Sequence, residues 1–443
     1  MEQFDQDRDE VIRRAREAGI EAFITIGSDL AGTLKCVGLS GRFEDVYASA
    51  GIHPHDARDY SEDVHRQLRE LAGSKKVVAI GETGLDYHYD HSPREVQRNV
   101  FRKQLELAEE TGLPAIIHCR EADEDALGIV RDSGLTRGVF HCFSGDAAMA
   151  EQVMAMGLYI SLAGPVTFRK AGGLHNIAAT VPDDYLLIET DAPYLAPEPF
   201  RGRRNEPAYL PRTAQKIAEL RGITLQDLAR ITTLNAKRLF NIGRLPEEAE
   251  IAYQIRDSLY LNITNRCSNR CSFCVKFHSD YVKGHRLRLS HEPTEDEIKQ
   301  EIGDPSRFRE IVFCGYGEPL YRLDTVRNIA AWVKERKGRV RINTNGHANL
   351  IHSRDVIPEL KGLVDSISVS LDAQDADTYE KICRPHFSNA FEGVVSFIRK
   401  VKEVVPDVQA TVVKLPGVDL ARCAALAEEL GIRLRVRELD VVG

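Results

Sequence analysis

The sequence predicts an α/β protein of two domains, an N-terminal TIM-type (β/α)8 barrel that lacks its first strand and a partial (β/α)6 barrel after it. Three observations support this fold class. A chain of 443 residues is too long for one ordinary core. Short β-branched runs alternate with amphipathic helical segments in both halves, as in βα units around a parallel sheet. An acidic, polar stretch at 241–250 separates the halves. We expect domains at 1–245 and 255–443, joined by a linker at 246–254.

The first half begins with a helical pattern at 8–18, where a barrel should begin with a strand. Seven strand-like runs follow, at 22–26, 46–51, 77–82, 115–118, 138–141, 158–162 and 186–191. Helical patterns at 211–221 and 225–240 then close this half. A closed (β/α)8 barrel needs eight strands, so we expect one strand to be missing before the first helix.

The second half has six strand-like runs separated by helical segments. They cover residues 259–263, 311–314, 340–343, 366–371, 408–413 and 433–437. Six βα units do not close a barrel, so we expect a sheet that stays open on one side.

Composition restricts the class of protein. No apolar run approaches the roughly 18 residues that a membrane helix requires, and the acidic first ten residues do not resemble a secretory signal. We therefore expect a cytoplasmic protein without a membrane partner. The net charge of −8 argues against a broad basic surface, so a nucleic acid would have to be held by a local basic patch. Nine cysteines in so long a chain favour metal ligation over a disulfide framework.

Three of these cysteines, Cys267, Cys271 and Cys274, lie on the expected loop after the first strand of the second half. Parallel βα folds place their chemistry on such loops. Three thiolates can hold three irons of a [4Fe-4S] cluster and leave the fourth iron open to a ligand. A zinc site is the alternative, with His278 as its nearby fourth ligand.

The C-x3-C-x2-C spacing, with Phe273 before the last cysteine, resembles the radical S-adenosylmethionine (radical SAM) superfamily over residues 255–440. The resemblance implies a [4Fe-4S] cluster that binds S-adenosylmethionine and cleaves it to a 5'-deoxyadenosyl radical, with an electron donor such as flavodoxin or ferredoxin. Three later strand ends match in order and are implied to contact that cofactor. The implied cofactor-binding residues are Phe273, Gly315, Gly317, Glu318, Asn345, Ser370 and Asp372.

Four strand ends of the first half carry metal-type ligands, which are Glu82, His118, His141 and Asp191. Strand ends of a parallel barrel converge on one face. A carboxylate, two imidazoles and a terminal aspartate there suit a pair of divalent ions that activates water. A single histidine in such a place is more often a hydrogen-bonded core residue, but four ligand residues at successive strand ends favour a metal site.

These motifs, together with Gly51-Ile-His53-Pro-His55 and the segment 200–207, resemble the TatD family of metal-dependent deoxyribonucleases in the amidohydrolase superfamily. The resemblance covers residues 1 to about 245 and implies hydrolysis of phosphodiesters, with single-stranded DNA as the typical substrate. It implies that Glu82 bridges two ions (Mg, Mn or Zn) and that Asp191 is a ligand or base. Arg201, Arg203 and Arg204 form the expected basic patch for the phosphate backbone, and His53 either contacts phosphate or supports a turn.

The family begins with a strand that ends in His-x-His, and this sequence has no such residues before its first helix. We therefore expect the reading frame to extend upstream of Met1. The leading interpretation is a fusion of two enzymes, a TatD-like hydrolase and a radical SAM enzyme of unknown substrate. Two alternatives stay open for the first half. It is either a nucleic-acid-binding or scaffolding module that serves the radical domain, or an amidohydrolase of small amides or esters.

Overall fold

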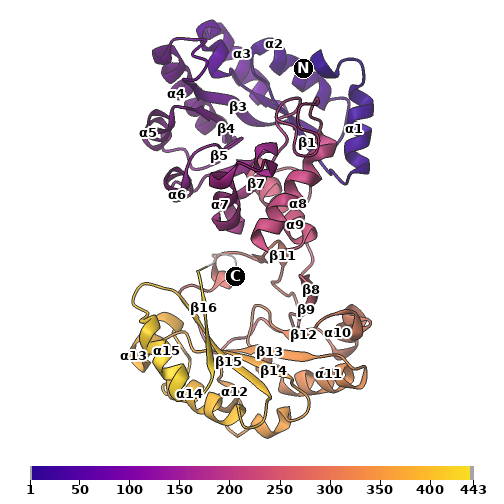
Figure 1. The fold of residues 1–443 in the computed structure, drawn as a ribbon, viewed down its shortest axis with the longest axis vertical. Coiled ribbons are helices and arrows are strands. Elements are labelled where there is room, and N and C mark those ends of the chain that lie inside the picture. Colours follow the sequence, from indigo (N-terminus) through magenta and orange to yellow (C-terminus); the bar gives the residue numbers. More distant parts are fainter. Residues whose placement is uncertain (1, 440–443) are drawn as a thin grey trace. The chain divides into compact units, whose positions relative to one another are not determined.

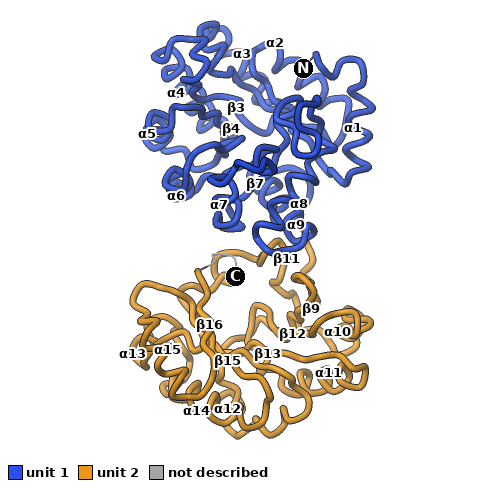
Figure 2. Tube along the Cα trace, viewed as in Figure 1, with its two compact units in different colours: residues 1–245 blue, residues 246–443 orange. Residues whose placement is uncertain are grey.

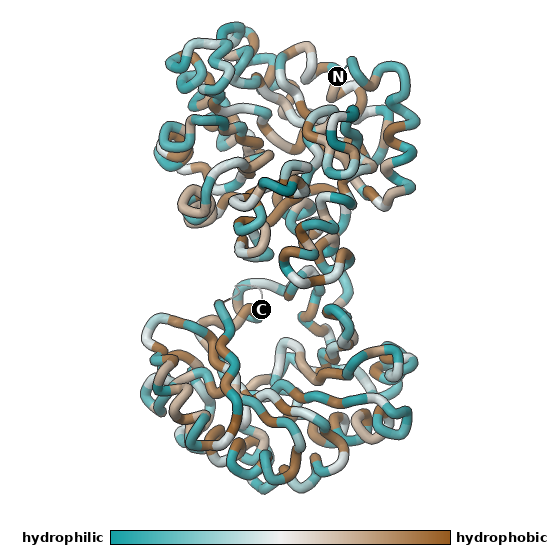
Figure 3. The backbone as a smooth tube through the Cα atoms, viewed as in Figure 1, coloured by the Kyte–Doolittle hydropathy of each residue, from teal (hydrophilic) through white to brown (hydrophobic). Residues whose placement is uncertain are grey.

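The computed structural model of the chain describes residues 2–439. It divides into two compact units, Met1–Leu245 and Pro246–Gly443 (Figures 1 and 2). Each unit has a hydrophobic core between its own sheet and helices, and Figure 3 shows hydrophobic segments along the strands of both. Within 2–439, no helix has both the length and the apolar character that a membrane crossing requires.

The first unit is built on a sheet of seven parallel strands in sequence order, which confirms the predicted barrel-type fold with seven strands. Its edges are the first and the last of these strands. The strands are β1 (Phe23–Thr25), β2 (Val46–Ala50), β3 (Val77–Asp86), β4 (Ala115–Arg120), β5 (Gly138–Phe140), β6 (Tyr159–Leu162) and β7 (Leu186–Ile188). Because all seven run in the same direction, their carboxyl ends lie along one edge of the sheet.

Nine α-helices of the first unit surround or extend this sheet. They are α1 (Arg8–Glu17), α2 (Leu30–Ser40), α3 (Glu62–Ala72), α4 (Arg94–Thr111), α5 (Asp123–Ser133), α6 (Ala147–Ala155), α7 (Gly172–Thr180), α8 (Leu210–Arg221) and α9 (Leu225–Phe240). Helix α9 shows how local sequence sets these boundaries. Thr224 and Asp227 form a capping box at its start, and Asn241 ends it in the left-handed conformation.

The main sheet of the second unit contains the six predicted parallel strands and one further strand that the sequence did not predict. The parallel strands are β9 (Ser258–Leu261), β12 (Ile311–Phe313), β13 (Val340–Thr344), β14 (Ser366–Ser370), β15 (Asp407–Val413) and β16 (Arg433–Arg437). The sheet order is β16-β15-β14-β13-β12-β9-β8. The helices are α10 (Glu295–Ile302), α11 (Leu323–Glu335), α12 (Ala348–Ile351), α13 (Ala376–Cys383), α14 (Ala390–Val401) and α15 (Leu420–Glu429).

The additional strand, β8 (Ala252–Ile255), pairs antiparallel with β9 and starts inside the range expected to be a linker. Arg256 adopts a positive φ of 57° in the two-residue connection. Sequence analysis missed this hairpin because a turn with φ > 0 is usually marked by glycine or asparagine, and here the connection is Arg256-Asp257. A second hairpin, β10 (Tyr281–Val282) with β11 (His285–Arg286), lies beyond the cysteine loop and was also not predicted.

Gly84 in β3 allows the backbone of β4 to approach it closely. Its φ is +140°, and a Cβ at this position would lie 2.0 Å from the carbonyl oxygen of His118. We predict that Gly84→Ala lowers the free energy of unfolding of the first unit by at least about 2 kcal/mol, because either the backbone or His118 must move. Urea denaturation followed by circular dichroism measures this change.

Gly38→Ala is the matched control, because Gly38 lies on helix α2 with no atom within 4 Å of the added Cβ. This variant should raise the free energy of unfolding by up to about 1 kcal/mol, since alanine loses less backbone entropy than glycine. Equal destabilisation by the two substitutions would contradict the close-approach argument.

Candidate functional site

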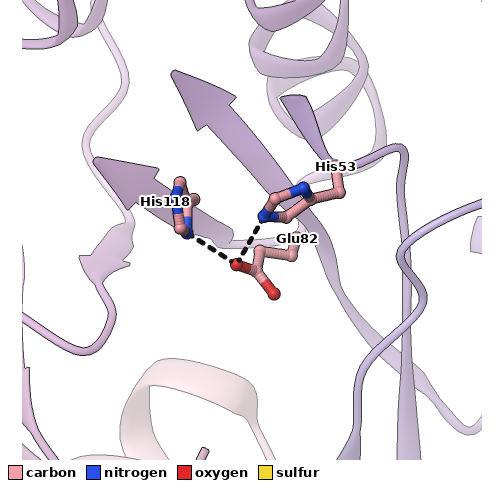
Figure 4. Close-up of side chains that lie close together, drawn as sticks. All are labelled: His53, Glu82 and His118. Carbon is pink, nitrogen blue, oxygen red and sulfur yellow. Dashed lines mark hydrogen bonds and ion pairs between the residues drawn. The ribbon is translucent and has the colours of Figure 1, made fainter. Parts of the chain in front are cut away.

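One carboxylate oxygen forms the centre of the first unit's site. Oε1 of Glu82 lies 2.7 Å from Nε2 of His141, 2.9 Å from Nδ1 of His118 and 3.4 Å from Nε2 of His53. Figure 4 shows His53 and His118 pointing at this carboxylate from two sides. The ligand atoms of His53, Glu82 and His118 all lie within 4.8 Å of one another, close enough to share one metal ion.

These four side chains come from separate elements that meet at one edge of the sheet. Glu82 lies within β3, where the register to β4 shifts between Ile80 and Thr83. The sequence analysis placed Glu82 at a strand end, whereas β3 continues to Asp86, because the irregularity interrupts the pairing without ending the strand. His118 belongs to β4, His141 directly follows β5, and His53 precedes the 3-10 helix Pro54–Asp59.

Two further carboxylates, which were not assigned from the sequence, hold the outer nitrogens of the histidines. Oδ2 of Asp86 lies 3.2 Å from Nε2 of His118 and 2.9 Å from Nε2 of His55. Oε1 of Glu189 lies 3.3 Å from Nδ1 of His141. Such carboxylate–histidine pairs orient imidazoles that bind a metal. Both acidic residues occur in the motifs that predicted the site, but only the fold shows which nitrogen each one contacts.

The three arginines of the expected basic patch have different surroundings. Arg204 forms a bidentate ion pair with Asp7, at 2.6 and 2.8 Å, and donates to the carbonyl of Gln3. Arg201 lies over the ring of Phe168. Within residues 2–439, Arg203 is the one of the three whose side chain has no recorded partner. Arg204 therefore anchors the N-terminal segment, and the binding of a phosphate by these arginines stays a proposal.

The cysteine loop of the second unit follows β9. Cys267, Cys271 and Cys274 are free thiols and are partly buried. The backbone of the loop is tied to the end of α13, because the amide of Arg270 donates to the carbonyl of Cys383 at 2.9 Å. A neighbouring bond joins the amide of Ser272 to the carbonyl of Ile382 at 2.8 Å. These two bonds attach the cysteine loop to the end of α13.

The Gly-Tyr-Gly turn after β12 packs directly against the loop after β9. A Cβ on Gly315 would lie 2.3 Å from Oδ1 of Asn262, and a Cβ on Gly317 would lie 2.4 Å from the carbonyl of Arg266. Both glycines are therefore explained by backbone packing around the cysteine loop. Their expected contact with a cofactor stays a proposal.

The remaining residues expected to bind the cofactor have different surroundings. Asn345 is in contact with the cysteine loop, since its Nδ2 lies 2.8 Å from Oγ of Ser268 and 3.7 Å from Sγ of Cys267. Glu318 accepts from the amide of Asn345 at 2.7 Å and is 2% exposed. Phe273 packs against the core of the second unit. Ser370 ends β14, and Asp372 is buried two residues beyond it.

Comparisons with known proteins match both units. Residues 1–241 match the family described as TatD related DNase. The chain belongs to the TatD family. Residues 261–430 match the radical SAM superfamily. The TatD domain is similar to the uncharacterized metal-dependent hydrolase YabD of Bacillus subtilis, with 46% identity over 244 residues that cover 55% of this chain and 96% of YabD.

Two other relatives add to this family match. The 3'-5' ssDNA/RNA exonuclease TatD of Erwinia tasmaniensis is 41% identical over 248 residues, which cover 54% of this chain and 96% of the relative. The crystal structure of the TatD homologue YJJV from Escherichia coli K12 aligns with a TM-score of 0.52 and 30% identity, over 54% of this chain and 94% of that one. The chain is thus a TatD-type hydrolase fused to a radical SAM domain, and both domains are enzymatic.

The family memberships imply a divalent metal, an iron-sulfur cluster and S-adenosylmethionine. The TatD site fits a divalent ion, because three imidazole nitrogens and a carboxylate oxygen form a typical donor set. The cysteine loop fits a cluster. Burial raises the pKa of Cys267 to about 12 and also raises that of Cys274. Iron supplies the positive charge that such thiolates require.

The acidic and imidazole groups of the TatD site shift one another's pKa values. Burial raises the pKa of Glu82, but the neighbouring His141, His118 and His53 hold it well below its usual value. Burial lowers the pKa of His141, but Glu82 and Glu189 raise it well above the usual value. Asp191 is compensated less, because the charges of His141 and His118 lower its pKa but do not cancel the effect of burial. Burial, with Glu189 and Glu82 adding to it, raises the pKa of Asp191 to about 7.

A buried hydrogen-bond network supports the cysteine loop of the radical SAM domain. Ser268 Oγ and Nδ1 of His347 are 3.0 Å apart, and Nε2 of His347 is 3.2 Å from the hydroxyl of Tyr379. That hydroxyl accepts from Nδ2 of Asn269 at 3.0 Å. Burial lowers the pKa of His347 to about 4. The imidazole is therefore neutral at pH 7 and can donate through one nitrogen and accept through the other.

We predict that metal binding to the TatD domain releases a proton from Asp191 near neutral pH. The pKa of about 7 means that lowering the pH from 8 to 6 protonates this carboxyl, so metal affinity should fall by up to about tenfold for each pH unit below 7. Calorimetric titration with Mn²⁺ in buffers of different ionisation enthalpy measures the proton release. Asp191→Asn should abolish the release, whereas the exposed control Asp59→Asn should retain it. Unchanged release in Asp191→Asn would contradict the assignment.

We predict that Tyr379→Phe weakens the cysteine loop, because it leaves Asn269 and His347 without their shared hydroxyl in a buried site. The expected loss is about 1–3 kcal/mol in the stability of the radical SAM domain, with faster loss of iron after anaerobic reconstitution. Thermal unfolding and iron content measure both effects. Tyr281→Phe is the control, because its hydroxyl bonds to the carbonyl of Pro246, away from the loop. Equal iron retention in the two variants would argue against a supporting role.

Proposed function

We propose that the TatD domain is a divalent-metal-dependent exonuclease that shortens single-stranded DNA or RNA. The observation that supports this proposal most is the arrangement of three imidazoles around Oε1 of Glu82 at the carboxyl edge of a parallel sheet. The similarity to exonucleases of this name adds the substrate class. A metal held there would polarise the phosphate and lower the pKa of its bound water.

The residues of the chain have distinct roles in this proposal. Glu82, His118, His141 and Asp191 would hold the metal ions, and His53 either joins them or contacts the phosphate. Asp86 and Glu189 fix the rings of His118 and His141 by accepting from their outer nitrogens.

Asp191 would be the group of the site that gains and loses a proton near neutral pH. Without metal its pKa is raised to about 7, so near neutral pH it can either lose its proton to a metal ion as a ligand or accept a proton from water as a base. Arg203 would bind the nucleic acid backbone outside the metal centre. Because Arg204 is paired with Asp7, its contribution to phosphate binding would be smaller than the sequence suggested.

For the radical SAM domain, we propose that Cys267, Cys271 and Cys274 hold a [4Fe-4S] cluster whose fourth iron binds S-adenosylmethionine. A reduced cluster held by these cysteines would supply the electron that cleaves this cofactor, and a small redox protein such as flavodoxin or ferredoxin would reduce the cluster. Asn345 donates towards Sγ of Cys267 and thereby orients one ligand. Gly315, Gly317, Glu318, Ser370, Asp372 and Phe273 would surround the cofactor.

Glu82→Gln tests the hydrolase proposal. Removing the shared charge should lower metal content and reduce the rate of single-stranded DNA shortening by at least about 100-fold, since the loss of a partner residue alone costs 10–100-fold at such sites. Metal analysis and a gel assay with a 5'-labelled oligonucleotide measure both. Glu70→Gln on the exposed face of α3 is the matched control and should leave both unchanged.

Three outcomes would contradict the proposal in different ways. Wild-type protein that binds metal and does not shorten DNA or RNA, but hydrolyses small amides or esters, would indicate the amidohydrolase alternative. Protein that binds single-stranded DNA without cleaving it would indicate a binding module. Unchanged cleavage in Glu82→Gln would exclude this carboxylate as the metal centre. Brown, iron-containing protein that forms 5'-deoxyadenosine on reduction would support the radical half independently, and zinc without iron would overturn it.

A further inference from the structure

The parallel sheet of the radical SAM domain has two chemically different faces. Alternate residues of its strands, such as Leu261, Phe313, Ile342 and Ile367, pack into the apolar core. Helices α10–α15 lie along the convex side of this sheet (Figure 2). Residues between these positions point to the other face, because side chains alternate along a strand. We call this second side the polar face.

The polar face carries a row of hydrogen-bonding side chains across the strands. The row consists of residues that lie opposite one another on neighbouring strands. Asn343 pairs with Ser368, Ser368 with Gln409, and Gln409 with Arg433. Cys314 follows Phe313, the partner of Ile342, and so continues the row onto β12. The next row towards the carboxyl end pairs Ser370 with Thr411 and Thr411 with Arg435.

Contacts along this face are polar. Nε2 of Gln409 donates to Oγ of Ser368 at 2.7 Å, and Arg341 donates to Oδ1 of Asn343 at 3.2 Å. Asn343 and Gln409 are only partly buried. A sheet face of this composition would be expensive to cover with apolar groups, so it suits a polar ligand.

Strand β16 brings positive charge to the carboxyl end of the polar face. Arg433 is paired with Asp407 at 2.7 Å. Arg435 and Arg437 are exposed, and within residues 2–439 neither forms an ion pair. Val413 pairs with Arg437, which places this arginine at the last position of the strand. Arg435 and Arg437 are two residues apart on one strand, so their side chains face the same side of the sheet.

The position of these arginines connects them with the cofactor end of the domain. The charge of Arg437 lowers the pKa values of Cys314 and Asp372, which lie after β12 and β14, although burial raises both. Arg437 is thus electrostatically close to the strand ends that follow the cysteine loop in the sheet. Ligands of open parallel sheets bind outside the carboxyl ends of the strands.

We propose that the polar face binds a nucleoside monophosphate as the substrate of the radical SAM domain, with Arg435 and Arg437 holding its phosphate. Paired guanidinium groups match the oxygens of a phosphate monoester. The amides and hydroxyls of Asn343, Ser368 and Gln409 face the sugar and base. This substrate class rests on the proposed exonuclease function, because an exonuclease releases mononucleotides. The hydrolase half would then supply the compound that the radical half modifies.

The experiment uses the full-length protein, anaerobically reconstituted and carrying Glu82→Gln so that metal-dependent binding at the hydrolase site is removed. Thymidine 5'-monophosphate, thymidine and inorganic phosphate are titrated by calorimetry in the presence of S-adenosylmethionine. The monophosphate should bind at least tenfold more tightly than thymidine. Arg435→Gln/Arg437→Gln should weaken its binding at least tenfold, with the affinity for S-adenosylmethionine unchanged.

The control is Arg399→Gln/Arg422→Gln, which removes the same charge from α14 and α15, where both arginines pair with acidic residues. It should bind the monophosphate like the parent protein. An equal loss of monophosphate affinity in both double variants would mean that the effect comes from net charge alone, and it would overturn the proposal. Weakened binding of S-adenosylmethionine alone would assign the arginines to the cofactor instead.

Absence of monophosphate binding in the parent protein would also overturn the proposal. The exonuclease assay on the same arginine substitutions in a background with native Glu82 separates this failure from failure of the hydrolase proposal. That activity should be unchanged, because β16 belongs to the other unit. Nucleotide binding without any exonuclease activity would remove the hydrolase as the source of the substrate and leave the binding site in place.

Discussion

In the first unit a single partly buried carboxylate, that of Glu82, interacts with three imidazoles, and the geometry of the site depends on that interaction. Burial alone would raise the pKa of Glu82, but His141, His118 and His53 hold it well below its usual value. Each of these rings comes from a different strand or loop. If β3, β4, β5 or the turn after β2 moved, an ionised carboxylate would be left in a buried place without its partners, and the energetic penalty for this is large. The charge of Glu82 therefore favours the arrangement of strands that keeps its three imidazole partners in place.

In the second unit, the cysteine loop is held in place by hydrogen bonds and close packing. It is held by backbone bonds to α13 and by the network from Ser268 through His347 to Tyr379. Close backbone packing adds to this, because only glycine fits at 315 and 317 without displacing the loop. Neutral hydrogen bonds and packing suit a site whose ligands must themselves become charged, since nearby carboxylates would oppose the thiolate form.

Both sites lie at the carboxyl ends of parallel strands, but their polar side chains are distributed differently. The hydrolase site brings Glu82 and its imidazole partners into a small volume. Asp86 and Glu189 contact the outer nitrogens of His118 and His141. The radical domain spreads its polar groups across a sheet face from β12 to β16. A compact arrangement favours binding of an ion, whereas a broad polar face favours a ligand of several functional groups.

The sequence by itself determined the order of the strands, the two halves, the cysteine motif and the acidic and imidazole groups near the strand ends. Hydrophobic periodicity is local, and parallel strand ends converge in any such fold, so these features follow from neighbouring residues. Only the tertiary structure decided that His53 faces Glu82 and that Asp86 and Glu189 hold the outer imidazole nitrogens. Only the tertiary structure pairs Arg204 with Asp7, which is 197 positions away. These contacts join residues that no local pattern relates, because hydrogen bonds and ion pairs depend on distance and orientation in the folded chain.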